Sequence, residues 1–190
     1  MKKVLFTFAL MLATMAAGAQ DIEFTPDGAY ERKDVVTVDS VSAAVLFDRA
    51  MMALTDWTGP DGKACAGIDY QNQETHTVVY KGSFYAGNRK WMMTQIDRYA
   101  NFTVKVRCKD GRAQVTVNVP TLTVTVASNG RTRTASLAEV VGEMKKTSGA
   151  RRERGEEAVQ YIIDTADNLF NAMKLRLHGQ GGSTGDDDDF

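Results

Sequence analysis

The chain has 190 residues, of which 43% are hydrophobic and 25% are charged, enough apolar material for one domain with short tails. Its 23 Lys and Arg residues nearly balance its 24 Asp and Glu residues, which leaves a net charge of -1. Nucleic-acid binding needs a concentrated positive field, so this balance argues against a nucleic-acid partner.

The N-terminus has the pattern of a secretion signal. Lys2 and Lys3 precede an apolar run over residues 4–17, and small residues follow it. This order predicts a signal peptide over residues 1–19 with cleavage before Gln20. The apolar run is too short to span a membrane, so we expect a soluble protein in the periplasm or outside the cell.

The first part of the mature chain predicts an extension, a strand and a helix. Residues 20–33 contain a Pro-Asp-Gly turn and form the extension, and residues 34–39 are a short strand. Ser40 can cap a helix that runs to about Thr55 and ends before a Gly-Pro-Asp-Gly segment. Apolar residues at helical spacing give this helix one buried side: Ala43, Phe47, Ala50, Met51 and Leu54.

Two further strands are expected, a weak one over residues 63–73 and a stronger one over residues 75–85, in which Val78, Tyr80, Gly82 and Phe84 share one face. A loop at 87–89 then leads into the next strand. Arg98 interrupts the apolar alternation of that strand, which indicates either a β-bulge or a later strand start.

The stretch from Asn101 to Val119 predicts a hairpin around Asp110-Gly111, which favours a two-residue type I′ turn. Pairing Lys109 with Arg112 implies the apolar pairs Cys108/Ala113, Val106/Val115, Val104/Val117 and Phe102/Val119, all on one face. A slip by one residue would expose every one of them, so the register should be firm. The opposite face carries Thr103, Lys105, Arg107, Gln114, Thr116 and Asn118.

After this hairpin the apolar positions change from odd to even numbers, with Pro120 between them. Because proline is tolerated at bulges and edges, the strand is expected to bend there and reverse its faces. Asn129-Gly130 is a second turn, and residues 131–134 return as an edge ribbon.

The C-terminal third predicts two helices. Ser136 and Glu139 fit a capping box that opens a short helix to about Lys146. A long amphipathic helix covers residues 152–177, and residues 179–190 form a flexible acidic tail. The apolar side of this helix is expected to consist of Ala158, Ile162, Thr165, Leu169, Met173 and Leu177. The basic run at 151–154 is interpreted as a solvated helix start rather than a phosphate clamp.

This order of elements, with the 41–57 helix, the Lys109-Asp110-Gly111-Arg112 turn and the long C-terminal helix, resembles a family of exported bacterial domains of unknown function. That family has a fold like one half of the TATA-binding protein (TBP). The resemblance covers residues 35–177 and implies a Gram-negative source and both helices on one sheet face. The expected fold class is α+β: a TBP-like curved antiparallel sheet of about five strands, ordered β-α-β-β-β-β-α, in one domain over residues 34–178.

The sequence contains few residues that could form a disulfide, bind a metal or act in catalysis. Cys65 and Cys108 could form a disulfide in an oxidising compartment or remain as two buried thiols. His76 and His178 have no metal-ligand spacing to them, so we expect no metal and no cofactor. Without a nucleophile motif or a His-acid pair, an enzyme is not expected either.

Two functional hypotheses follow. In the first, the protein is a binding or interaction module that presents the six polar residues of its uncovered sheet face to a partner in the envelope. In the second, it carries a small hydrophobic ligand near Tyr85 and the Trp91-Met92-Met93 segment. An apolar cavity between the sheet and the long helix would favour the carrier.

Overall fold

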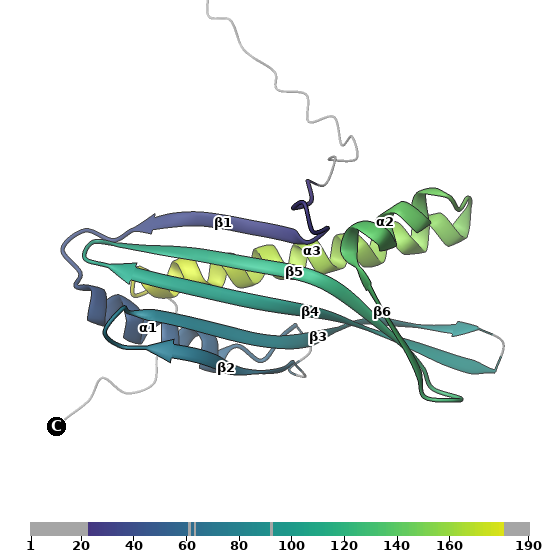
Figure 1. The fold of residues 1–190 in the computed structure, drawn as a ribbon, viewed down its shortest axis with the longest axis horizontal. Helices are drawn as coiled ribbons and strands as arrows, with labels where there is room; N and C mark the ends of the chain where they lie inside the picture. Colours follow the sequence, from purple (N-terminus) through teal and green to yellow (C-terminus); the bar gives the residue numbers. More distant parts are fainter. Residues whose placement is uncertain (1–22, 61, 63, 92, 181–190) are drawn as a thin grey trace, which may run out of the picture.

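The computed structural model describes residues 23–60, 62, 64–91 and 93–180. The predicted signal peptide and most of the acidic tail therefore lie outside the described residues. Along the chain the elements are β1 (Tyr30–Thr37), α1 (Ala43–Asp56), β2 (Cys65–Asn72), β3 (Thr77–Trp91), β4 (Thr94–Lys109), β5 (Arg112–Val126), β6 (Arg131–Ser136), α2 (Leu137–Lys145) and α3 (Ala150–Leu177) (Figure 1).

The strands form one open antiparallel sheet, which confirms the predicted α+β class. Its order is β1-β5-β4-β3-β2, and β6 pairs with the second half of β5. The described residues thus hold six strands where about five were expected, because the ribbon after Asn129-Gly130 joins the same sheet.

The β4–β5 hairpin has the predicted register over most of its length. Lys109 pairs with Arg112, and the valine pairs 106/115 and 104/117 lie on the same face. Gly111 has a φ of 73°, which suits the two-residue turn. The turn is also held by α1, since Asp110 Oδ1 accepts a hydrogen bond of 2.8 Å from the Ala43 amide.

The predicted Phe102/Val119 pair does not form. The register shifts so that Thr103 pairs with Asn118 while Asn101 pairs with Thr121, which leaves one extra residue in β5. The sequence predicted that apolar residues on the core side change from odd to even numbers at this point. The burial of Leu122 confirms this change. Pro120 separates the part of β5 that pairs with β1 from the part that pairs with β6, where its missing amide breaks no ladder bond.

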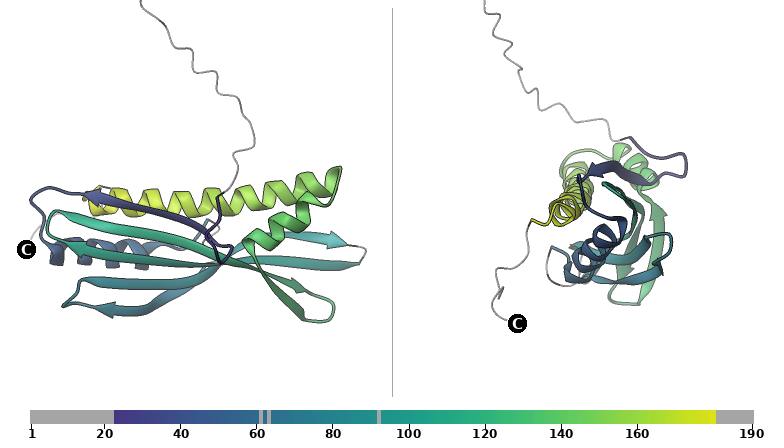
Figure 2. Two further views of the ribbon diagram at one scale, coloured as in Figure 1. Left: turned by 45° about the horizontal axis from the view of Figure 1, so that its top comes forward. Right: turned by 90° about the vertical axis from the view of Figure 1, so that its left-hand side faces the viewer.

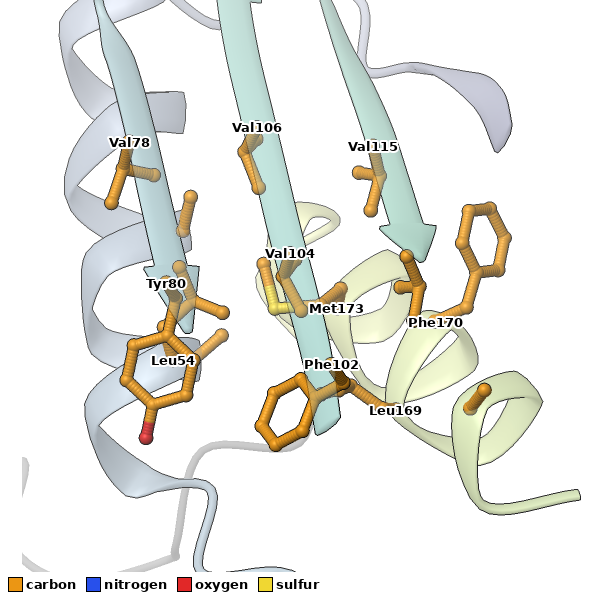
Figure 3. Close-up of a cluster of buried hydrophobic side chains, with 14 of the residues drawn as sticks. Leu54, Val78, Tyr80, Phe102, Val104, Val106, Val115, Leu169, Phe170 and Met173 are labelled. Carbon is orange, nitrogen blue, oxygen red and sulfur yellow. The ribbon is translucent and has the colours of Figure 1, made fainter. Parts of the chain in front are cut away.

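Both long helices cover one face of the sheet, as the end-on view in Figure 2 shows. The core lies between them and the sheet, and Figure 3 shows strand valines meeting Leu54 of α1 and Leu169, Phe170 and Met173 of α3. The buried side of α3 contains the expected residues 162, 165, 169, 173 and 177, whereas the expected Ala158 is only half-buried. Val159, Ile163, Ala166 and Phe170 are buried in addition. On α1, the expected Ala43 and Met51 are only half-buried, whereas Leu46 and Ala53 are buried.

Two predicted boundaries were wrong for a common reason. Strand β1 begins at Tyr30 rather than at residue 34, because its backbone pairs with β5 from Tyr30/Val119 onward. The α1 cap is Ser42, which accepts from the Val45 amide, while Ser40 has a φ of 64° in the preceding loop. In each case hydrogen bonds to distant residues decide, since β1 pairs with β5 and the Ala43 amide at the start of α1 donates to Asp110. Local patterns do not report such bonds.

The predicted loop at 87–89 was also wrong, because β3 continues through it to Trp91. A register shift between Tyr85 and Asn88 forms a β-bulge there, with Gly87 at a φ of 91°. Strand β4 starts at Thr94, so the bulge opposite Arg98 belongs to β3 rather than to the strand that carries Arg98.

The helices after β6 fit the sequence closely. The Ser136 hydroxyl accepts from the Glu139 amide, and the Glu139 carboxylate accepts from the Ser136 amide, so the predicted capping box is confirmed. Helix α3 begins at Ala150, two residues earlier than expected.

A glycine allows β2 to lie against β3, and this gives a test of the sheet edge. A Cβ on Gly82 would come within 2.6 Å of the Ala66 backbone, whereas a Cβ on Gly67 would meet nothing within 4 Å. We predict that Gly82→Ala lowers the free energy of unfolding by about 1–3 kcal/mol, because β2 must shift. Urea denaturation measures this.

The matched control is Gly67→Ala on the paired strand, which should change stability by less than about 0.5 kcal/mol. Equal effects of the two substitutions would contradict the close β2–β3 contact.

Candidate functional site

The six polar residues predicted on the uncovered face do share that face. Thr103 pairs with Asn118, Lys105 with Thr116, and Arg107 with Gln114, and directly opposite residues in an antiparallel sheet project to the same side. All six are half-buried or exposed, while the residues between them are buried against the helices.

At the turn end of this face there is a depression of about 720 Å³. Its cationic residues are Lys105, Arg107, Lys109 and Arg112, from β4 and β5. We call the depression with these four residues the cationic cup. Its wall also includes polar and apolar residues of four strands: Val35, Tyr70, Thr77, Val79 and Gln114.

Of the six predicted residues, Lys105, Arg107 and Gln114 line the cup, while Thr103, Thr116 and Asn118 do not line it and lie further along the same face. Sequence reasoning missed Lys109 and Arg112, although their alternation with Arg107 and Gln114 places them on this face. It also missed Val35 and Tyr70, which reach the cup only because β1 and β2 join the sheet.

The charge of the cup is not neutralised within the described part of the chain. None of its four cations forms an ion pair there, whereas Lys81 on β3 pairs with Asp69 at 2.9 Å. Asp110, next to Lys109 in the turn, instead accepts the Ala43 amide. Clustered like charges on a concave surface raise the local potential for an anionic group.

The cup also offers apolar contact. Val35 is 47% exposed and Tyr70 is 48% exposed, and both line the depression beside the cations. Large apolar side chains next to charged groups are characteristic of binding surfaces.

The second predicted region, near Tyr85 and Trp91, lies at the end of β3. Tyr85 contacts Tyr99 at 5.7 Å between ring centroids, and Trp91 ends β3, with its side chain and Met92 outside the described residues. A cleft at this end of the sheet is lined by charged side chains, including Arg89 and Lys90, which does not favour a hydrophobic ligand.

The two cysteines are free thiols, so the disulfide alternative is not realised. Cys65 pairs with Ser83, which pairs with Asn101, and Cys108 lies seven residues further along β4. At ~3.3 Å per residue this is about 23 Å, far beyond disulfide reach. The alternative of two buried thiols was wrong for Cys65, which is exposed at the sheet edge, and right for Cys108, where burial raises the pKa of the thiol to about 11.

Neither histidine lies in a catalytic arrangement. His76 packs edge-on against Phe47 at 6.1 Å, and His178 caps the C-terminal end of α3. Within the described ranges, no cluster of three His, Cys, Asp or Glu residues could hold a metal ion. No helix in those ranges has the length and apolar character needed to cross a membrane.

An uncovered, twisted antiparallel sheet with its helices on the other face defines a TBP-like α+β domain. Residues 33–122 match the family described as a domain of unknown function (DUF4468) with TBP-like fold, and this confirms the family resemblance seen in the sequence. No curated protein matches the chain.

Two solved structures share this fold. A DUF4468 family protein from Bacteroides ovatus ATCC 8483 has a TM-score of 0.57 at 16% identity, with 85% of this chain and 92% of that chain covered. A TBP-like protein from Parabacteroides distasonis ATCC 8503 has a TM-score of 0.52 at 10% identity, with 80% of this chain and 97% of that chain covered.

The thiols give a test of which side of β4 faces the core. We predict that a maleimide labels Cys65 in the native protein and labels Cys108 at least about tenfold more slowly, because Cys108 is buried and poorly ionised. The measurement compares native labelling rates of Cys65→Ser and Cys108→Ser by mass spectrometry. Similar rates for the two variants would contradict the facing of β4.

Proposed function

We propose that the protein is an exported, non-enzymatic envelope protein that binds an acidic polypeptide partner in the cationic cup. The observation that carries the proposal is the set of four cations on an uncovered concave surface without ion-pair partners among the described residues. The N-terminal pattern of lysines, apolar run and small residues supports export.

The shape of the site favours a polypeptide over a compact ligand. Residues of β1, β2, β3, β4 and β5 line the cup, so it is a shallow depression that runs across the strands of the sheet. An extended acidic segment could place carboxylates on Lys105 and Arg107 and an apolar side chain against Tyr70. Arginine suits this role because its planar group binds a carboxylate through two parallel hydrogen bonds.

A non-enzymatic role is supported by what the sequence and the site contain. The cup has no side chain ready to act as a nucleophile or general base: its ionisable wall residues are lysines, arginines, a tyrosine and the buried Cys108. The pKa of the Cys108 thiol is raised to about 11, which disfavours its reactive thiolate.

We predict that Lys105→Ala/Arg107→Ala weakens binding of a fluorescein-labelled oligoglutamate peptide at least about tenfold, because two charge-assisted contacts are lost. Fluorescence anisotropy at low and at physiological salt measures the affinity. Binding by the native protein should weaken as salt rises, since exposed charges are screened.

The matched control is Lys145→Ala/Lys174→Ala, which removes the same charge from exposed positions on α2 and α3. It should bind as the native protein does. An equal loss in both variants would show only nonspecific charge attraction, and no loss in the cup variant would reject the cup as the site.

A further inference from the structure

A second charged cleft, of about 630 Å³, lies at the opposite end of the sheet from the cup. It is formed by the ends of β3 and β4 on one side and by α2 and the start of α3 on the other. The left view of Figure 2 shows these two parts of the molecule facing each other at the end away from the β4–β5 turn.

Five cations line this cleft: Arg89 and Lys90 of β3, Arg98 of β4, and Arg151 and Arg154 of α3. The cleft also contains two carboxylates, and one of them, Glu143, already pairs with Lys146 at 2.7 Å. None of the five cations forms an ion pair with a described residue. The lining therefore has a clear excess of positive charge.

Arg98 occupies a position that the fold would fill with an apolar residue. Ala100 and Phe102, at the next two positions of the same parity, are buried under the helices. Among the described residues, Arg98 Nε is the one buried side-chain nitrogen or oxygen without a hydrogen-bond partner. A half-buried guanidinium without an acceptor destabilises a fold unless something compensates its charge.

The β-bulge in β3 adds a second arginine to the same side. Beyond the register shift, Arg89 pairs with Ile96, which has the parity of Arg98, so Arg89 faces the cleft instead of the open sheet face. Gly87, at the bulge, lies beside Arg98: a Cβ there would be 3.9 Å from the Arg98 guanidinium, which is an ordinary contact distance. Burial and the charge of Arg89 both lower the pKa of Arg98, yet a guanidinium stays protonated at neutral pH.

Helix α3 brings the remaining arginines and its N-terminus. Arg154 Nε donates to Ala150 O at 2.8 Å, and Arg151 and Arg154 line the cleft, whereas Arg152 pairs with Glu156 at 2.8 Å and does not line it. The N-cap, Gly149, provides no side-chain acceptor for the first turn. Cations in the first turn also oppose the helix dipole. A bound anion would offset both the missing side-chain acceptor and this unfavourable charge.

We propose that this cleft binds a ligand with a phosphoryl group, held by Arg98, Arg151 and Arg154. Guanidinium groups match tetrahedral oxyanions through paired hydrogen bonds, and Arg98 supplies a donor that has no acceptor in the protein. The volume of the cleft exceeds that of phosphate itself and is in the range of small-molecule sites, so an organic phosphate fits better than the free ion.

Isothermal titration calorimetry tests the proposal with three probes: inorganic phosphate, glycerol 3-phosphate, and phosphatidylcholine vesicles with and without phosphatidic acid. Binding of glycerol 3-phosphate more tightly than inorganic phosphate is the expected result. Binding only to the phosphatidic acid vesicles would assign the phosphoryl group to a lipid headgroup. Binding to none of the probes would overturn the proposal.

Arg98→Leu gives two opposite readouts. Without ligand it should raise the melting temperature, because an unpaired charge is removed, while affinity for the probe that binds should fall at least about tenfold. An unchanged affinity would overturn the proposal. If this variant does not fold, Arg151→Gln/Arg154→Gln provides the same affinity test from exposed positions.

Two controls separate this site from its surroundings. Arg152→Gln changes the same helical turn outside the cleft and should bind the probe as the native protein does. The Lys105→Ala/Arg107→Ala variant of the cup should also retain phosphate binding, so failure at one site leaves the other testable. If Arg152→Gln and Arg151→Gln/Arg154→Gln lose affinity for the probe equally, the effect depends only on net charge, and the cleft is rejected as the binding site.

Discussion

The register of the β4–β5 hairpin is the constraint on which the other features depend. The Asp110-Gly111 turn pairs Lys109 with Arg112, and period-two alternation then places the valines of both strands on one side and Lys105, Arg107, Lys109 and Arg112 on the other. The Asp110 carboxylate holds the start of α1 against the turn, so the same residue pair that fixes the register also positions a helix over the apolar face.

The two charged sites are consequences of this arrangement at opposite ends of the sheet. At the turn end, Lys105 and Arg107 lie on the side without helices, and the edge strands add Val35 and Tyr70. At the other end, the helices diverge from the strand ends and leave a cleft in which Arg98 lies on the covered side. The cup therefore results from the regular alternation of polar and apolar residues, whereas the cleft results from a charged residue, Arg98, at a position where that alternation predicts an apolar one.

The sequence predicted those parts of the fold that local patterns encode. The turn, the valine pairs, the capping box at Ser136 and the buried side of α3 could all be predicted because each depends on residues close in sequence. The early start of β1 and the continuity of β3 could not, since pairing with distant strands decides them, and neither could the cap at Ser42, where the next amide donates to Asp110 in the distant turn. The same limit applies to the cup: Lys105, Arg107 and Gln114 were predicted from alternation, whereas Val35 and Tyr70 depend on which strands become neighbours.

Nuclear Overhauser contacts from the side chains of β4 test the central claim most directly. The register predicts contacts from the Val104 and Val106 methyl groups to α1 and α3, cross-strand contacts between Val106 and Val115, and no contacts from Lys105 or Arg107 to either helix. Contacts between the helices and Lys105 or Arg107, with the valines free of them, would show that the sheet faces the other way and would contradict the account.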